Sequence, residues 1–321
     1  MEDQFQRKIE YARISVTDRC NLRCRYCRPD HQEILEHKDI LTYEELLQIC
    51  EMFCRLGIRR FKVTGGEPLV RHGCLSFMRS LKQLTGVKQV TLTTNGTLLR
   101  PQISKLKEIK IDGINISLDT LDPEKYRQIT GSYQLEEVLA SIDAAWEAEI
   151  PVKINKVLLP EDTMEDLWPF VERFMDKRKI PVRLIEQMPF GNQKVRPAVL
   201  TGETILKAIQ QSGRSAAKLD TAFGNGPASY YRIQGAAAPL GLIEAVHGNF
   251  CAECNRIRLT SAGWLKPCLY SPPTISLRNL LRSGRSEEEI LQKIRKEIFA
   301  KPASHHFGEK PSAEEMYRIG G

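Results

Sequence analysis

Residues 12–27 read ARISVTDRCNLRCRYC, an alternating stretch that runs into three closely spaced cysteines. Apolar and polar residues alternate from Ala12 to Thr17, which predicts a β-strand with one apolar face. The cysteines follow as Cys20-x3-Cys24-x2-Cys27, so one short loop presents three thiolates, which suit a soft metal or an iron–sulfur cluster. Three ligands leave one coordination position open, and open positions in metal enzymes receive water or substrate.

The same alternation recurs along the first two-thirds of the chain and predicts six strands, each followed by a helix. We expect strands over residues 12–18, 60–65, 90–95, 113–119, 152–158 and 182–188. The helix predicted over 43–56 has Thr42 and Glu45 as a capping box and Gly57 as its stop. Amphipathic helices are also predicted over 135–149 and 163–177. Six consecutive βα units indicate a parallel sheet, either an incomplete barrel or a doubly wound sheet.

The polar face of these strands favours the barrel. Parallel strands covered on both faces should be continuously apolar, but these carry polar and basic residues at every second position. A closed eight-stranded barrel fills its interior with branched apolar side chains. We therefore predict an α/β fold, an incomplete (β/α)6 barrel of the TIM type, with a lumen that holds a large polar ligand. Met188 is in phase with Leu184 and not with Arg183, which requires a bulge or an early turn.

A second cysteine triplet, Cys251-x2-Cys254-x13-Cys268, lies in the less regular last third. Short strands are predicted there over 230–233, 240–246 and 256–260, with a hairpin turn at 262–263, a helix over 287–299 and a polar tail over 301–321. We predict two regions, a partial barrel over 1–200 and a smaller α+β region over 201–321 that closes the open side. Zinc is an alternative at both triplets, with His31 or His37 near the first and His247 near the second.

Composition limits the classes of protein. The 321 residues are 41% hydrophobic and 27% charged, with no apolar run long enough to span a bilayer and no signal peptide. A cytoplasmic location is expected, where thiols stay reduced. The net charge of +7 suits an anionic ligand, but the basic residues are dispersed, so no nucleic acid partner is predicted. Cys50, Cys54 and Cys74 fall on apolar helix faces and are read as core thiols.

Two motifs on consecutive strands carry a resemblance. The first triplet has an aromatic residue, Tyr26, directly before its last cysteine, and the next strand ends in Thr64-Gly65-Gly66-Glu67-Pro68. Together they resemble the radical S-adenosylmethionine superfamily. The resemblance implies a four-iron cluster whose open iron binds S-adenosylmethionine, and an electron that cleaves it to a 5′-deoxyadenosyl radical.

The second triplet narrows the resemblance to one family. Arg256 and Arg258 follow Cys254 on one face of a predicted strand, where two guanidiniums suit a phosphate. With the last two glycines and the segments TDRCN (17–21), TTNG (93–96) and NISLD (115–119), the chain resembles the GTP 3′,8-cyclase family of molybdenum cofactor biosynthesis over nearly its whole length. The resemblance implies two [4Fe–4S] clusters, held by Cys20, Cys24 and Cys27 and by Cys251, Cys254 and Cys268. It places S-adenosylmethionine at Tyr26, Gly66, Ser117 and Met188, and GTP at Arg13, Lys62, Thr93, Lys153, Arg256 and Arg258.

The implied reaction converts GTP into (8S)-3′,8-cyclo-7,8-dihydroguanosine 5′-triphosphate, after abstraction of the ribose 3′ hydrogen. The open iron of the second cluster would bind the guanine edge, and Gly320 and Gly321 would reach into the active site. Lys62 departs from the family's usual arginine, so a less directional grip on GTP is expected. An external low-potential electron donor, a downstream cyclic pyranopterin monophosphate synthase and a possible homodimer are further expectations.

Two other classes of protein stay open from sequence. The first is another radical S-adenosylmethionine enzyme with an auxiliary cluster, such as one that modifies a peptide. The second is a non-enzymatic electron carrier or a zinc-stabilised binding protein.

Overall fold

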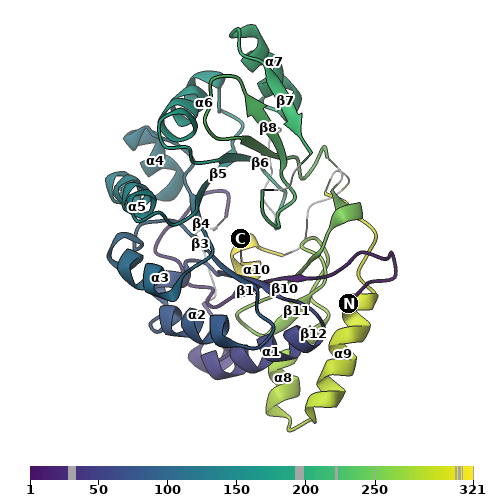
Figure 1. Ribbon diagram of the computed structural model, residues 1–321. Coiled ribbons are helices and arrows are strands. Elements are labelled where there is room, and N and C mark those ends of the chain that lie inside the picture. Colours follow the sequence, from purple (N-terminus) through teal and green to yellow (C-terminus); the bar gives the residue numbers. More distant parts are fainter. Residues whose placement is uncertain are drawn as a thin grey trace.

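The computed structural model describes residues 1–27, 34–191, 199–220, 223–248, 250–307, 309, 312 and 314–320. In this part of the chain the strands form one sheet in the order β12-β11-β10-β1-β2-β3-β4-β5-β6-β9-β8-β7, which curves around a central space (Figure 1). The strands are β1 Tyr11–Ser15, β2 Arg60–Thr64, β3 Gln89–Thr94, β4 Ile114–Ser117, β5 Val152–Leu158, β6 Val182–Glu186, β7 Ala216–Leu219, β8 Ser229–Ile233, β9 Leu240–Ile243, β10 Arg256–Leu259, β11 Trp264–Lys266 and β12 Ile275–Ser276.

The helices cover the outer face of the curved sheet, except α10 near the end of the chain, which lies inside the ring of strands (Figure 1). They are α1 Tyr43–Arg55, α2 Cys74–Gln83, α3 Ile103–Ile109, α4 Pro123–Thr130, α5 Leu135–Glu147, α6 Met164–Phe170, α7 Gly202–Gln211, α8 Leu277–Arg282, α9 Glu287–Phe299 and α10 Met316–Ile319. The predicted capping box of Thr42 and Glu45 is present, and Gly57 follows α1 with a left-handed φ of +88°. The helix predicted over 163–177 is present, although α6 contains Pro169 and continues as a π-helical turn over Val171–Asp176.

Strands β1 to β6 run parallel in chain order, which confirms the predicted array of βα units. The C-terminal region then extends both edges of this array. β9 pairs in parallel with β6, and β10 pairs in parallel with β1. The connection over residues 244–255 therefore crosses the open side of the barrel, and Glu186 Oε2 accepts hydrogen bonds from the backbone N–H of Val246 (2.6 Å) and His247 (3.1 Å).

The two faces of the strands have opposite characters, as predicted. Ala12, Ile14, Phe61 and Val63 are fully buried in the core that packs against the helices. The alternate positions face the lumen, and the register aligns them: Arg13 lies opposite Lys62 on β2 and opposite Arg258 on β10. Three cationic side chains from three neighbouring strands therefore share one level of the lumen.

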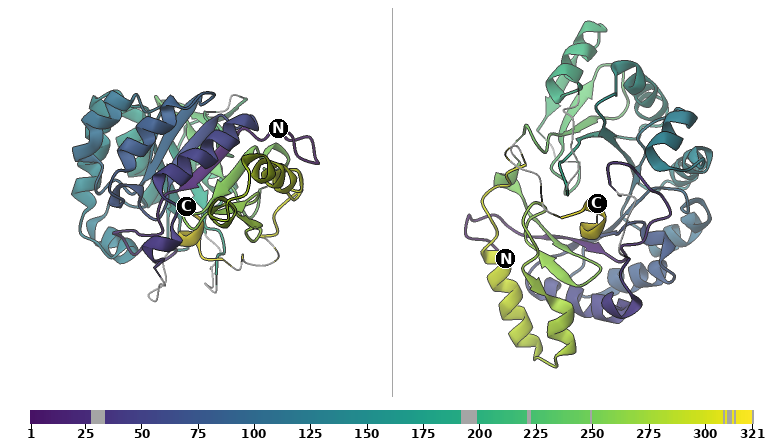
Figure 2. Two further views of the ribbon diagram at one scale, coloured as in Figure 1. Left: turned by 90° about the horizontal axis from the view of Figure 1, so that it is seen from below. Right: turned by 180° about the vertical axis from the view of Figure 1, so that it is seen from behind.

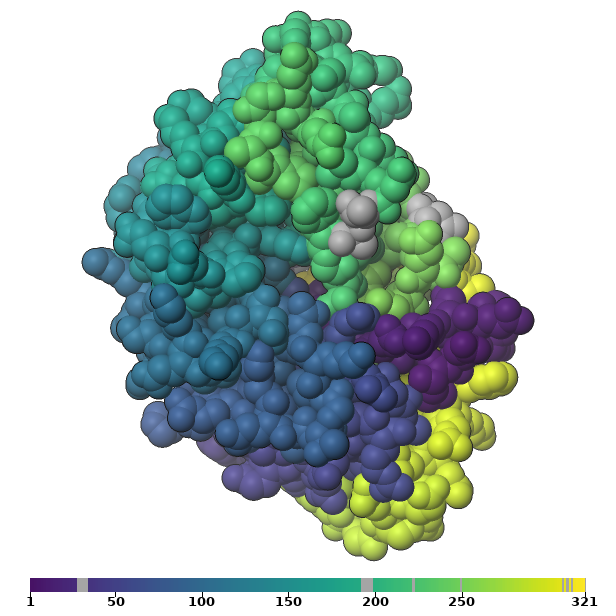
Figure 3. Space-filling view, viewed as in Figure 1, coloured from purple at the N-terminus to yellow at the C-terminus, as the bar shows by residue number. Residues whose placement is uncertain are grey.

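Segments from the last third of the chain close the lumen. In the space-filling view, atoms of the β7–β8 region fill much of the front of the barrel (Figure 3). There Phe223 O accepts a hydrogen bond from Lys153 Nζ, and Asn225 Nδ2 donates to Gln89 Oε1. Seen from behind, the end of the chain lies inside the ring of strands (Figure 2, right). It packs through a small second core of Phe190, Phe307 and Ile319.

The tail over 301–321 is polar in composition, but several of its side chains are nevertheless buried: Lys301, Phe307, Tyr317 and Ile319. No helix in the described ranges is long and apolar enough to cross a membrane.

Candidate active site

The first cysteine triplet lies in the loop that follows β1, at the carboxyl end of the parallel strands. Two backbone hydrogen bonds fix this loop against the end of α4, from Arg23 N to Thr130 O (2.9 Å) and from Arg25 N to Ile129 O (3.0 Å). Cys27 N donates to Cys24 O (2.9 Å), and Leu22 N donates to Cys20 Sγ (3.4 Å). The loop is therefore anchored at both its backbone and one of its sulfurs.

The glycine pair after β2 supports this loop from the neighbouring strand. Gly66 N donates to Thr17 O (2.8 Å), and a Cβ at Gly66 would lie 2.4 Å from Arg19 O. At Gly65 a Cβ would lie 2.6 Å from Thr17 O. Only glycine permits this approach of two backbones. The Gly65-Gly66 pair thus sets the position of the chain immediately before Cys20.

Tyr26 and Asp119 form a buried pair beside the first triplet. Tyr26 Oη donates to Asp119 Oδ2 (2.7 Å), while Asp119 Oδ1 accepts from Val157 N (2.8 Å). Burial raises the pKa of Tyr26 well above its usual range, so the phenol keeps its proton. Burial also raises the pKa of Cys24 well above its usual range, and Asp119, Cys27 and Cys20 add to this effect. The Cys24 thiolate therefore needs a bound cationic group to stay ionised.

The second triplet is built from two segments. Cys251 and Cys254 lie in the connection between β9 and β10, and Cys268 follows β11. Arg7 donates from one guanidinium nitrogen to Cys251 O (2.8 Å). Burial alone would raise the pKa of Cys254, but Lys301 and Arg256 lower it to about 6. The Arg256 guanidinium also donates to Cys254 Sγ at 3.8 Å.

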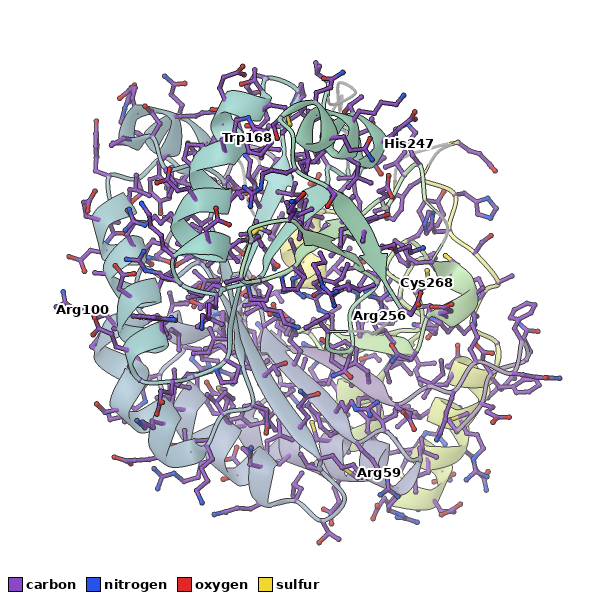
Figure 4. The ribbon with its side chains drawn as sticks, turned by 45° about the horizontal axis from the view of Figure 1, so that its top comes forward. Arg59, Arg100, Trp168, His247, Arg256 and Cys268 are labelled. Carbon is purple, nitrogen blue, oxygen red and sulfur yellow. The ribbon has the colours of Figure 1, made fainter. Side chains whose placement is uncertain are left out.

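All six predicted cluster ligands line one cavity. Its wall also contains Arg13, Tyr26, Gly66, Thr93, Ser117, Met188, Arg256 and Arg258 from the predicted ligand contacts. Figure 4 labels Arg256 and Cys268, which reach this cavity from β10 and from the segment after β11. Met188 also lines the cavity, and β6 ends at Glu186, two residues before it, so the strand predicted over 182–188 ends earlier than expected.

Each donor set consists of three thiols, which suit a soft metal or an iron–sulfur cluster. Among the described residues no group of three His, Cys, Asp or Glu side chains is arranged to hold one metal ion. Of the histidines considered for zinc, His247 Nδ1 contacts Glu186, His37 begins a 3₁₀ turn, and His31 lies outside the described residues.

A group of cationic side chains lies in the lumen. Arg13, Arg256 and Arg258 line the cavity that holds both triplets, whereas Lys62, Lys153 and Arg183 belong to the same electrostatic group but are not in the cavity wall. Burial lowers the pKa of Lys62 well below its usual range, and the charges of Arg183, Arg13, Lys153 and Arg256 lower it further. Burial and the neighbouring Arg13 and Arg256 act on Arg258 in the same direction. Like charges at this density repel each other, and a bound polyanion would relieve the repulsion.

The tail contacts this cationic group at Arg258. Gly320 O accepts a hydrogen bond from the Arg258 guanidinium at 2.9 Å. Gly320 has a φ of +80°, and a Cβ there would lie 2.8 Å from Ser15 Cβ. A side chain at this position would therefore clash with β1. Gly321 lies outside the described residues.

Sequence reasoning missed several residues of the site. Arg183 is one of the lumen cations. It lies opposite Asn155 on β5 and precedes the apolar Leu184 on β6, so the alternation of polar and apolar residues could have identified it. Asn95 donates from Nδ2 to Cys20 Sγ (3.8 Å) and to Asn21 Oδ1 (2.9 Å), and it belongs to a segment that was noted only as a family mark. Lys301 and Arg7 gave no signal, because their contacts join distant parts of the chain.

An open array of parallel strands with three cysteines after its first strand defines the radical S-adenosylmethionine class of proteins. Residues 14–174 match the model of the radical SAM superfamily. The crystal structure of Streptococcus suis SuiB bound to S-adenosylmethionine has the same fold, with a TM-score of 0.66 at 14% identity over 96% of this chain and 76% of that chain.

Two further comparisons narrow the class. Residues 180–307 match the model named Molybdenum Cofactor Synthesis C. A GTP 3′,8-cyclase of Clostridium perfringens (strain SM101 / Type A) is 38% identical over 325 residues, and one of Heliobacterium modesticaldum is 40% identical over 330 residues. Both alignments cover 100% of this chain and of the relative. The chain belongs to the GTP 3′,8-cyclase family.

Proposed function

We propose that this protein is a GTP 3′,8-cyclase, which converts GTP into (8S)-3′,8-cyclo-7,8-dihydroguanosine 5′-triphosphate in molybdenum cofactor biosynthesis. The observation that carries the proposal is the cavity lined by all six thiols and by Arg13, Arg256 and Arg258, which belong to a larger group of cationic side chains in the lumen. The full-length relatives of the same name support it. They do not favour the alternative of a peptide-modifying enzyme.

The chain's thiols would hold two [4Fe–4S] clusters. Cys20, Cys24 and Cys27 would hold the cluster that binds S-adenosylmethionine, and Cys251, Cys254 and Cys268 would hold the cluster that binds substrate. When bound, the first cluster and S-adenosylmethionine supply one-electron chemistry that ends in abstraction of a hydrogen atom from carbon. The protein's own contribution is to hold the substrate so that one carbon–hydrogen bond is in reach.

Different residues would bind S-adenosylmethionine and GTP, according to their place in the cavity and the lumen. Tyr26, fixed by Asp119, would line the S-adenosylmethionine site together with Gly66, Ser117 and Met188. The cationic lumen would bind the triphosphate through Arg13, Lys62, Lys153, Arg256 and Arg258, with Arg183 as an addition. Thr93 would contact GTP from β3. The tail would cover the bound nucleotide through Gly320 and Gly321, since Gly320 already contacts Arg258.

The remaining expectations belong to the same proposal. Residues 1–200 would carry the first cluster and 201–321 the second, although strands from both regions pair in one sheet. The protein would receive electrons from an external low-potential donor and would form a homodimer. A downstream cyclic pyranopterin monophosphate synthase would use its product.

The direct test is product formation by the reconstituted protein. The chain is reconstituted with iron and sulfide without oxygen and then incubated with GTP, S-adenosylmethionine and dithionite. We expect the cyclised nucleotide by mass spectrometry and 5′-deoxyadenosine in proportion to it. Cleavage of S-adenosylmethionine without any cyclised nucleotide would reject the proposed reaction and leave the superfamily assignment intact.

A further inference from the structure

Lys301 is a buried lysine in the cavity wall beside the second triplet, and its side chain is only 2% exposed. Its Nζ donates to Arg256 O at 2.9 Å and also to Pro267 O. Arg256 lies two residues after Cys254, and Pro267 directly precedes Cys268. One ammonium group therefore joins the two segments that carry the second triplet.

Lys301 differs from the other fully buried lysines in its partners. Lys156 pairs with Asp162 at 2.8 Å, and Lys266 contacts Glu314. Within the described residues, Lys301 forms no ion pair with a carboxylate; its Nζ has carbonyl partners instead. A buried cation without an anion is strongly destabilising. Lys301 lines the same cavity as the three thiols of the second triplet.

The backbone around Lys301 is held by the N-terminal segment. Lys301 O accepts hydrogen bonds from Gln4 Nε2 (3.2 Å) and from the Arg7 guanidinium (3.5 Å). The same guanidinium donates to Cys251 O at 2.8 Å and to Pro302 O at 2.6 Å. Arg7 is itself buried and pairs with Asp3 at 2.6 Å. The ammonium of Lys301 is thus fixed relative to the second triplet.

We propose that Lys301 is the fixed counter-cation of the second iron–sulfur cluster, which holds the Cys254 and Cys268 segments together and raises the reduction potential of the cluster. The inference rests on the proposed second cluster. Three thiolates on a [4Fe–4S]²⁺ core leave a net charge of about −1, and reduction adds one more negative charge. A positive charge fixed in a site of low dielectric stabilises the reduced form more than the oxidised form.

The test uses the full chain with Cys20, Cys24 and Cys27 replaced by alanine, so that only the second triplet can bind iron. Lys301→Gln keeps hydrogen-bond donors but removes the charge, and Lys301→Met removes both. Lys296→Gln is the matched control, because Lys296 is an exposed lysine on α9 whose charge is screened by solvent. Iron content and an EPR-monitored redox titration are measured without GTP.

We expect about four irons per chain in the background variant and in Lys301→Gln, with a lower midpoint potential in the latter. Lys301→Met should lose most of the iron, and Lys296→Gln should match the background in both measurements. An unshifted midpoint in Lys301→Gln would overturn the electrostatic role, and full iron in Lys301→Met would overturn the holding role. A background variant that binds no iron would overturn the second cluster itself and this inference with it.

Discussion

The two cysteine triplets line the same cavity but have opposite electrostatic surroundings. At the first triplet, burial and the carboxylate of Asp119 raise the pKa of Cys24 well above its usual range. At the second, Lys301 and Arg256 overcome the effect of burial and lower the pKa of Cys254 to about 6. The loop of the first triplet has an anionic neighbour, whereas the second triplet lies beside buried cations.

This difference matches the charges of the two proposed ligands. S-adenosylmethionine carries a sulfonium cation, which suits the side of the cavity with Asp119 and Tyr26. GTP carries a triphosphate, which suits the side with Arg256, Arg258 and Arg13. The same fold thus supplies two three-thiol sites and distinguishes them by the residues around them rather than by the number of thiols.

The largest expected effect separates the two triplets by deletion. Replacing Cys20, Cys24 and Cys27 with alanine should lower the iron content from about eight to about four per chain and abolish cleavage of S-adenosylmethionine. Replacing Cys251, Cys254 and Cys268 should remove the same amount of iron and abolish cyclisation, while uncoupled cleavage persists. Iron analysis and product quantification distinguish the two variants. Cyclised product from either one would contradict the assignment of roles.

The second prediction tests the electrostatic contrast in the metal-free protein. Thiolates, not thiols, react with iodoacetamide, and Cys24 and Cys254 are both partly exposed. At pH 7 Cys254 is above its pKa and Cys24 is far below its own, so Cys254 should be alkylated at least about tenfold faster. The Cys24 rate should continue to rise through pH 9, while that of Cys254 levels off above about pH 7. Peptide mapping by mass spectrometry gives both rates, and equal rates at pH 7 would contradict the contrast.

A third, smaller effect concerns the tail, which contacts Arg258 in the cavity wall and approaches Ser15 on the neighbouring strand. Deleting Gly320 and Gly321 should lower turnover by about tenfold or more, because the bound nucleotide loses a positioning contact. Uncoupled cleavage of S-adenosylmethionine should change little. Single-turnover kinetics separate these two steps. Full retained turnover would show that the tail has no catalytic role.

The smallest expected effect is at Lys62, one of the lumen cations. Lys62→Arg should bind GTP about threefold more tightly, since a guanidinium can donate two parallel hydrogen bonds to a phosphate. Lys88→Arg makes the same change at an exposed position and serves as the control. Calorimetry without S-adenosylmethionine gives both dissociation constants. Unchanged or weaker binding in Lys62→Arg would show that the lumen has no room for the larger group.

The first two-thirds of the fold could be predicted because each strand carries its own signal. Alternation of polar and apolar residues gave β5 with its observed bounds and the other five parallel strands to within a few residues. The partners of β9 and β10 could not be predicted, because they depend on which edge of the sheet each strand reaches. β9 and β10 are close in sequence, but they lie beside opposite ends of the six-stranded parallel array, next to β6 and β1. No local sequence pattern predicts this.

The candidate site divides in the same way. The cysteines and the polar strand positions were predicted, because their spacing is local. Lys301 was assigned to a polar tail, although the structure buries it between Arg256 and Pro267. Arg7 was given no role, although it joins Asp3, Cys251 and Pro302. Lys301 contacts residues 34 and 45 positions away, and Arg7 contacts residues 244 and 295 positions away, so only the folded chain brings them together.

In the proposed function, the cluster at the second triplet binds GTP in the same cavity where the cluster at the first triplet binds S-adenosylmethionine. The most direct test is hyperfine spectroscopy of the second cluster with GTP labelled with ¹⁵N in the guanine, using the chain in which Cys20, Cys24 and Cys27 are alanine. If guanine binds the second cluster, we expect a ¹⁵N coupling to the cluster that is absent with unlabelled GTP. A cluster that forms but shows no coupling at saturating GTP would contradict it.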